Sequence, residues 1–255
     1  MINVLVHGFM GKMGRVICRM VEQDDSLNLL CGVDAVVGNN SENFPVFSSL
    51  DKVNVKADVI IDFSTAQAVP ALLEYAQKTK TPVVICTTGL SNDMINRAKA
   101  ASTTVPVFLS FNMSLGINLL AMLLKKCSPV LADAGFDIEI VERHHNQKID
   151  APSGTAILLA DAVNESLNNS YSYTYDRSKS REKRGSKEIG MSSIRGGTIV
   201  GRHDVIFAGL DEVIELTHIA QSKEVFGNGA VNAAKFLAEK EQGMFDMQDL
   251  LQKYI

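Results

Sequence analysis

The sequence predicts an α/β protein with a doubly wound parallel sheet, followed by a smaller α+β domain with a mixed or antiparallel sheet. Short apolar runs alternate with helix-like segments over residues 1–114, which is typical of parallel strands joined by crossover helices. After Ser114 the alternation changes, and most later segments are β-like. The length of 255 residues is enough for two modest domains that each bury a core.

Composition and charge narrow the possible partners. Hydrophobic residues make up 46% of the chain and charged residues 21%, which is ordinary for a globular protein. The net charge of −4 argues against nucleic acid or an anionic membrane as the main partner, and we expect no apolar run long enough to span a bilayer. The four cysteines have no metal-like spacing. We therefore expect a cytoplasmic protein with reduced thiols and no metal site.

A glycine-rich loop near the N-terminus is the first functional signal. It follows a strand-like run and precedes a helix-like segment, and the next strand-like run ends at Asp34. Glycines allow the backbone to approach a pyrophosphate at the helix N-terminus, and the acid would bind the adenosine ribose. The pattern predicts a Rossmann-type domain with cofactor contacts at Gly8, Phe9, Met10, Gly11, Lys12, Met13 and Asp34. Because the spacing is GxxGxxG rather than GxGxxG, a glycine-rich turn in an unrelated α/β protein is the alternative.

Three further apolar runs, at residues 57–63, 82–86 and 105–110, complete the predicted parallel sheet. Ser64 and Ser91 are placed to cap the helices that follow the first two runs. Ligands of such sheets bind beyond the carboxyl ends of the strands. The nicotinamide side of the cofactor site should therefore be lined by Cys86, Thr87, Thr88, Ser110, Phe111, Asn112 and Met113. For the two threonines the alternative is ordinary hydrogen bonding at a strand end.

The segment 142–156 carries the strongest chemical signal. It holds His144, His145 and Lys148, followed by a Pro-Ser-Gly-Thr helix start. Histidine transfers protons near neutral pH, lysine donates one where its surroundings lower its pKa, and the first turn of a helix binds anions. One segment could thus hold a carboxylate and protonate a neighbouring atom. The alternative is a surface loop before a common type of helix start.

The string HHNQKIDAPSGTA, at residues 144–156, resembles the signature of the dihydrodipicolinate reductase family, His-His-x-x-Lys-x-Asp-Ala-Pro-Ser-Gly-Thr-Ala. The match has no gaps. The family's Gly-Thr-Thr-Gly and Asn-x-Ser-x-Gly-x-Asn motifs follow the same order here, with Cys86 in place of the usual first glycine and Met113 where many relatives have phenylalanine.

The resemblance implies a function and a division of roles. Family members reduce a cyclic imine dicarboxylate with NAD(P)H in lysine and diaminopimelate biosynthesis. Lys148 would be the proton donor and His144 its acid/base partner, while the substrate would be bound by His145, Ser153, Gly154 and Thr155. Residues 1–114, completed by 223–255, would form the dinucleotide-binding domain. Residues 115–222 would bind the substrate and build a homotetramer.

The residue after Asp34 bears on the choice of cofactor. Relatives that use NADPH well have an arginine there, whereas this chain has Ala35. A carboxylate beside a 2′-phosphate is repulsive, and no arginine screens it. We therefore predict a preference for NADH, with NADPH use left open because Lys12 could approach the phosphate.

The C-terminal half gives weaker signals. The polar stretch 168–187 predicts a solvated loop, and Arg195 is the cation we expect to contact substrate or to order a loop. Residues 198–207 and 211–218 predict two antiparallel strands, in which His203 and His218 are expected to be structural. A helix from Phe226 and a helical piece over 247–254 close the chain.

Two other functions stay open. One is a different two-domain dehydrogenase that acts on an amino acid or a sugar, which would need a catalytic motif of its own. The other is a non-enzymatic sensor of NADH, but such sensors usually carry a DNA-binding module, and neither the charge nor the sequence supports one.

Overall fold

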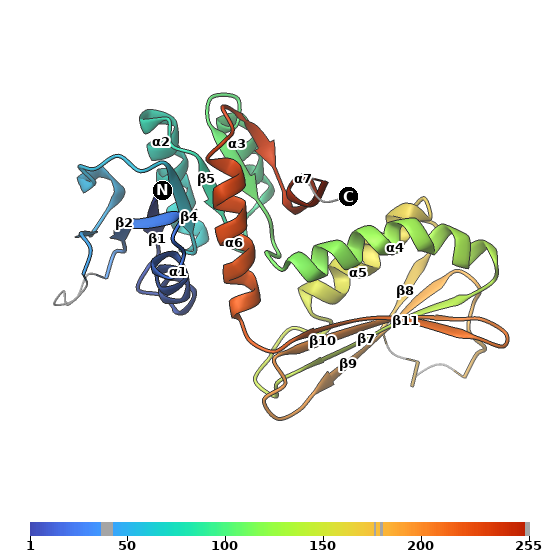
Figure 1. Cartoon of the computed structure of the whole chain (residues 1–255). Helices are drawn as coiled ribbons and strands as arrows, with labels where there is room; N and C mark the ends of the chain where they lie inside the picture. Colours follow the sequence, from blue (N-terminus) through green and yellow to red (C-terminus); the bar gives the residue numbers. More distant parts are fainter. Residues whose placement is uncertain (37–42, 176, 179–180, 253–255) are drawn as a thin grey trace. The chain divides into compact units, whose positions relative to one another are not determined.

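The computed structural model describes residues 1–36, 43–175, 177–178 and 181–252 (Figure 1). The chain forms two compact units, Met1–Leu115 with Glu224–Ile255, and Gly116–Lys223. Each junction lies one residue beyond the boundary expected from the sequence. Residues 37–42, Lys179 in the polar stretch 168–187, and the end of the helix expected at 247–254 lie outside the described residues.

The first unit is built on a parallel sheet of seven strands in the order β12-β6-β5-β4-β1-β2-β3. The strand β1 pairs in parallel with β2 on one side and with β4 on the other. The strand order therefore reverses beside β1, and the carboxyl ends of the strands share one edge, where such sheets bind ligands. The strands are β1 (Ile2–His7), β2 (Leu27–Val33), β3 (Val46–Phe47), β4 (Val59–Asp62), β5 (Val83–Ile85), β6 (Pro106–Leu109) and β12 (Gly243–Phe245).

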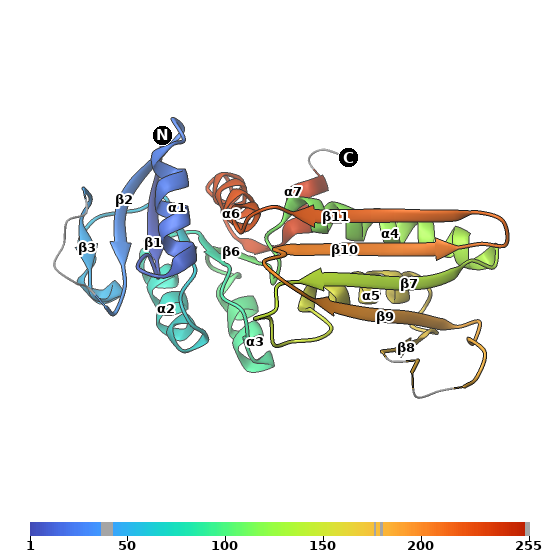
Figure 2. The same ribbon diagram turned by 90° about the horizontal axis from the view of Figure 1, so that it is seen from below.

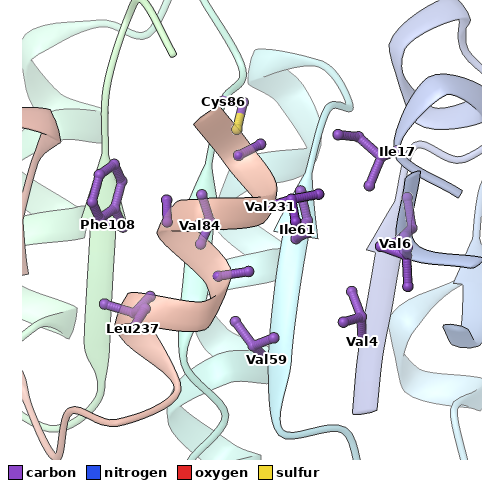
Figure 3. Close-up of a cluster of buried hydrophobic side chains, with 14 of the residues drawn as sticks. Val4, Val6, Ile17, Val59, Ile61, Val84, Cys86, Phe108, Val231 and Leu237 are labelled. Atoms are coloured by element: carbon purple, nitrogen blue, oxygen red, sulfur yellow. The ribbon is translucent and has the colours of Figure 1, made fainter. Parts of the chain in front are cut away.

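Two cores lie on the two faces of this sheet. Alternate side chains of a strand point to opposite faces, so Val4 and Val6 belong to one core and Leu5 to the other. Helices α1 (Lys12–Glu22) and α6 (Glu224–Leu237) cover the first face. Figure 3 shows Val231 and Leu237 of α6 against the apolar side chains of the strands. Helices α2 (Val69–Thr79) and α3 (Asn92–Ala101) pack on the second core.

Of the two helix caps predicted in this unit, the structure contains one. Ser91 accepts a hydrogen bond from the amide of Met94 at 3.3 Å, so the predicted cap of α3 is confirmed. Ser64 does not cap α2, because a 3₁₀ turn, η2 (Ala66–Ala68), intervenes and α2 begins at Val69. Pro70 lies in its first turn, where the missing N–H costs nothing. A second 3₁₀ turn, η1 (Leu50–Lys52), precedes β4.

The second unit is a mixed sheet of five strands covered on one face by two helices (Figure 2). Its central strand β7 pairs in parallel with β9 and antiparallel with β10, so the predicted α+β architecture is confirmed. The strands, in sheet order, are β11 (Val213–Ala220), β10 (Gly201–Ala208), β7 (Asp137–His144), β9 (Glu188–Arg195) and β8 (Ser172–Thr174). The helices are α4 (Leu115–Asp133) and α5 (Gly154–Ser166).

Helix α4 corrects one expectation. By length and composition it could cross a bilayer, and it is the one such helix among the described residues, whereas the sequence was expected to contain no run of that length. Its apolar composition has another explanation, because Ile117, Leu120 and Leu124 pack into the core of the second unit. The helix also continues through Pro129 to its end at Asp133.

The polar stretch before β9 is less solvated than predicted. Arg184 is 18% exposed at its side chain, and its guanidinium donates to Asp137 at 2.6 Å and to Glu139 at 3.1 Å. It also donates to the carbonyls of Ile138 and Glu188. A buried arginine with this many acceptors is structural, while Arg181, Lys183 and Lys187 are exposed, as expected.

Candidate active site

The signature segment begins inside strand β7, which extends to His144. The alternation that places Ile138 and Ile140 in the core also points Glu142 and His144 inward. Glu142 is 1% exposed and His144 is 8% exposed. The strand thus continues three residues past Val141, the last residue of the apolar run, into the charged start of the signature segment.

The carboxylate of Glu142 is surrounded by donors. One oxygen accepts from Nδ1 of His144 at 2.5 Å and from Arg195 at 2.8 Å. The other accepts from Arg195 at 2.7 Å and from the backbone amide of Ser153 at 3.2 Å. Burial opposes its ionisation, but the hydrogen bonds from Arg195 and His144 outweigh burial and lower the pKa of Glu142 to about 2. Glu142 is therefore an ionised, buried acceptor.

His144 lies between this carboxylate and the start of β10. Burial lowers its pKa, the charges of Lys148 and Arg195 act in the same direction, and Glu142 opposes them. Because an ionised carboxylate can only accept, Nδ1 of His144 carries a proton and Nε2 is the other available nitrogen. A Cβ atom on Gly201 would lie 3.1 Å from that Nε2, so the glycine leaves room for the ring.

A second buried histidine supports the start of helix α5 (Gly154–Ser166). Ser153 Oγ accepts from the amide of Ala156 at 3.1 Å, as an N-cap, and lies 3.0 Å from Nε2 of His203. The rings of His144 and His203 are 5.1 Å apart, edge to face. Burial, and then the neighbouring His144, lower the pKa of His203 to about 4. His203 thus packs directly against two candidate site residues.

Lys148 already holds a carboxylate. Its Nζ lies 2.8 Å from Oδ1 of Asp150. The hydrogen bond from Lys148 is the main cause of the lowered pKa of Asp150, and the backbone of Gly154 contributes as well. Arg195 donates to the carbonyl of Asp150, so it ties the loop to Glu142. His145 is half-buried, and Gly154 is exposed with open space around it.

In the first unit, the glycine loop is built for close packing. Gly8 has a φ of +80°, and a Cβ there would lie 2.7 Å from the carbonyl oxygen of Phe63. A Cβ on Gly14 would lie 2.1 Å from the carbonyl oxygen of Gly8. Helix α1 begins at Lys12, after Gly11, so its first amides follow the tight turn that a pyrophosphate requires. The amide of Met10 donates to Asp34 at 3.1 Å and orients its carboxylate.

A cavity of about 360 Å³ opens beside this loop. Eight of the predicted cofactor residues line it, namely Gly11, Lys12, Met13, Cys86, Thr87, Thr88, Phe111 and Met113. Phe63, Ser64 and Phe226 also line it and were not predicted as cofactor contacts. Phe226 comes from the distant helix α6, so no local sequence signal places it there. A glycine-lined loop and an adjoining cavity fit a nicotinamide dinucleotide.

Other predicted cofactor residues have structural contacts. The side chain of Phe9 is buried and packs edge to face on Phe44, with 5.8 Å between ring centroids, so only its backbone could face a cofactor. Ser110 Oγ donates to the carbonyl of Asn112 at 2.9 Å, which shapes the turn after β6. Burial raises the pKa of Cys86 well above its ordinary value, so this residue remains a thiol.

Sequence reasoning missed a buried acid beneath this cavity. Asp62, at the end of β4, has no exposed surface. Its carboxylate accepts from Thr87 Oγ1 at 2.6 Å and from the amide of Ser64 at 3.2 Å, and it lies 2.8 Å from Nδ1 of His7. The ends of β1 and β4 and the loop after β5 are thereby joined, and Thr87 is held in place.

A second cavity of about 380 Å³ lies in the first unit and includes Ala35 and His7. Lys78 and Glu74 of α2 also line it, whereas Lys12 lines the other cavity. The cation that lines the same cavity as Ala35 is therefore Lys78, which the sequence did not single out.

The glycine loop, the sheet edge and the two-unit architecture define a class, the NAD(P)H-dependent oxidoreductases. Solved structures share this fold. A dipicolinate-bound dihydrodipicolinate reductase from Paenisporosarcina sp. TG-14 aligns with a TM-score of 0.80 over 100% of both chains, at 23% identity. A probable dehydrogenase from Thermotoga maritima aligns with a TM-score of 0.59 over 98% of this chain and 92% of its own, at 12% identity.

The sequence places the chain within that class. Residues 2–113 match the model of the dihydrodipicolinate reductase N-terminus, and residues 116–251 match that of the C-terminus. The chain belongs to the dihydrodipicolinate reductase family. It is 50% identical, over 99% of both chains, to a 4-hydroxy-tetrahydrodipicolinate reductase of Caldanaerobacter subterraneus subsp. tengcongensis. It is 46% identical, over 98% of both chains, to one of Clostridium botulinum. The resemblance noted in the sequence is confirmed, and the sensor alternative is set aside.

Proposed function

We propose that this chain is a 4-hydroxy-tetrahydrodipicolinate reductase. The reaction takes 4-hydroxy-2,3,4,5-tetrahydrodipicolinate, NAD(P)H and a proton to 2,3,4,5-tetrahydrodipicolinate, NAD(P)⁺ and water. A bound nicotinamide supplies the hydride, which adds at C4 once the hydroxyl has left as water. The observation that carries the proposal is a carboxylate held by Lys148 beside the buried pair His144 and Glu142. The relatives named 4-hydroxy-tetrahydrodipicolinate reductase, which match over nearly their whole length, support the proposal.

The start of α5 is the proposed grip for a substrate carboxylate. Lys148 and the backbone of Gly154 bind the carboxylate of Asp150 in the structure, so both offer the chemistry that a dicarboxylate needs. We assign Ser153, Gly154 and Thr155 to that grip and His145 to the substrate as well. With a net charge of −4 on the chain, these local donors are what attract an anion.

Lys148 is the proposed proton donor. Hydride addition to an unsaturated imine leaves an enamine, which must gain a proton on carbon. Lys148 follows His144 by four residues in the same segment, and its charge acts on the pKa of His144, which supports a shared role in proton transfer. His144, with one nitrogen committed to Glu142, is the proposed acid/base partner.

NADH is the proposed preferred cofactor. The carboxylate of Asp34 suits ribose hydroxyls and repels a 2′-phosphate, and Ala35 brings no cation to screen it. Lys78 lines the same cavity as Ala35 and is the residue that would permit some NADPH use.

A homotetramer is proposed through the outer face of the second sheet. Ile194, Val213 and Ile219 point away from the helices and are 44%, 58% and 56% exposed. Exposed apolar side chains on one sheet face favour a second copy as partner. Light scattering after size exclusion measures the mass of the oligomer. Ile219→Lys places a charge on the proposed interface and should lower that mass.

Isotope transfer tests the reaction itself. With NADH deuterated at the transferable position, the product should carry one deuterium at C4, as measured by mass spectrometry and NMR. Deuterium at another carbon, or none, would contradict the proposed reduction.

A further inference from the structure

We infer that Glu142 is a positioning residue for the reaction, because its carboxylate fixes the orientation of His144 and ties the signature loop to it. The inference rests on the proposed function, in which His144 is an acid/base group. Glu142 does not itself have to reach a substrate, since it is 1% exposed.

The hydrogen-bond pattern leaves His144 one arrangement. Nδ1 donates to Glu142 at 2.5 Å, and the same carboxylate receives both terminal nitrogens of Arg195. An ionised acceptor selects the tautomer with the proton on Nδ1. Nε2 is then the nitrogen that can take up or release a proton during the reaction.

Packing holds the ring from the other side. A Cβ on Gly201 would approach Nε2 of His144 to 3.1 Å, which is tighter than nine in ten real Cβ contacts. The ring is therefore confined between a carboxylate on its own strand and the backbone of β10. An alanine at 201 would push the ring without removing any charge.

The carboxylate also fixes the loop that carries the other proposed groups. It accepts from the amide of Ser153, the N-cap of α5, at 3.2 Å. Through Arg195 it is linked to the carbonyl of Asp150. One buried acid thus connects His144, the loop with Lys148, and the helix start that would bind a carboxylate.

The same strand provides a matched control. Glu139 also pairs with two arginines, Arg177 at 3.2 Å and Arg184 at 3.1 Å. It lies on the opposite face of β7, and the ion pairs cited for it in the described part of the chain involve Arg177 and Arg184 rather than proposed site residues. If Glu142 served only to hold the sheet together, the loss of either charge would have similar consequences.

Glu142→Gln keeps the side-chain shape and removes the charge. We expect kcat to fall about 10- to 100-fold, because a misoriented His144 would lose part of the rate that acid/base catalysis contributes. The Kd of NADH, measured by fluorescence titration, should not change. The groups facing His144 are Glu142, Arg195, Lys148 and His203. Of these only Glu142 favours the protonated ring, so the inflection of kcat/KM assigned to His144 should move to lower pH. Glu139→Gln should leave kcat and the profile as in the wild type.

Two further variants keep the test decisive. Glu142→Gln could fail to fold because the guanidinium of Arg195 loses its partner. In that case the double variant, Glu142→Gln with Arg195→Gln, removes the unpaired positive charge. Gly201→Ala should lower kcat with NADH binding intact. His144→Gln, measured in parallel, should lower kcat roughly 100-fold or more. Full activity of His144→Gln would refute the acid/base role of His144 on which the inference rests. A loss of activity there, with wild-type kcat and pH profile in the Glu142 and Gly201 variants, would overturn only this inference.

Discussion

Nζ of Lys148 lies 2.8 Å from the carboxylate of Asp150, within the segment that carries the family signature. The ammonium is thus already used to bind an anion, and the backbone of Gly154 also helps to lower the pKa of that carboxyl group. This pair of donors is the structural basis for assigning carboxylate recognition and proton donation to one short loop.

Removal of the ammonium should stop turnover without affecting the cofactor. Lys148→Ala is expected to lower kcat roughly 100-fold or more, because carbon protonation loses its donor, while NADH titration gives a wild-type Kd. Lys125→Ala is the control, since Lys125 forms a similar ion pair with Glu165 at 2.7 Å on the helices. Near-normal turnover of Lys148→Ala would refute its role.

The glycine loop should not tolerate a methyl group. Gly14→Ala would bring a Cβ to 2.1 Å from the carbonyl oxygen of Gly8, so helix α1 must shift. We expect weaker NADH binding and a lower Tm, with a loss of about 1 to 3 kcal/mol in the free energy of unfolding. At Gly196 no atom lies within 4 Å of an added Cβ, and Gly196→Ala should keep its Tm. Calorimetry with and without NADH compares the two.

Cofactor preference should depend on residues 35 and 78. Ala35→Arg supplies a guanidinium for a 2′-phosphate and should raise kcat/KM for NADPH about tenfold. Lys78→Ala should lower NADPH use and leave NADH use unchanged, because Lys78 shares a cavity with Ala35. Lys80→Ala, just beyond the end of the same helix, is the control. A strong wild-type preference for NADPH would contradict the account.

Stability should fall below neutral pH because of His203. Burial lowers its pKa from 6.5 to about 4, so between these values the unfolded chain binds a proton that the folded chain does not. Stability therefore rises with pH across this window and is lost as pH falls, by about 2 to 3 kcal/mol between pH 6.5 and 4.5. His144 and His218, whose pKa values are also lowered by burial, act in the same direction.

Urea unfolding at several pH values measures this dependence. His203→Gln should flatten the curve between pH 4.5 and 6.5, where Glu142, with a pKa of about 2, stays ionised. A wild-type slope in the variant would show that the proton uptake belongs to another group.

Local patterns predicted the parts of the fold that depend on neighbouring residues. The apolar run before Gly8, the glycines and the acid at 34 lie within one short part of the sequence, so strand, loop and helix follow from them. The short edge strand β12 was not expected, because its three residues have no alternation and pair only with β6. Phe226 reaches the cofactor cavity from the far end of the chain, which only the folded sheet arranges.

In the candidate site, too, contacts between residues distant in the sequence were not predicted. His144 and Lys148 were found because they lie four residues apart in a short segment. Glu142 was passed over, although its spacing from Ile138 and Ile140 places it on the inward face of β7. Its pairing with Arg195 joins residues 53 positions apart, and the sequence offered Arg195 only as an isolated cation. Asp62 was hidden in an apolar run for the same reason.

The central claim is that this chain reduces the product of the condensation of pyruvate with aspartate semialdehyde. The most direct measurement generates that substrate in situ with the preceding synthase and follows the absorbance of NADH and NADPH when this protein is added. The account predicts rapid oxidation that requires the synthase, faster with NADH. No oxidation of either cofactor, by a protein that still binds NADH, would contradict it.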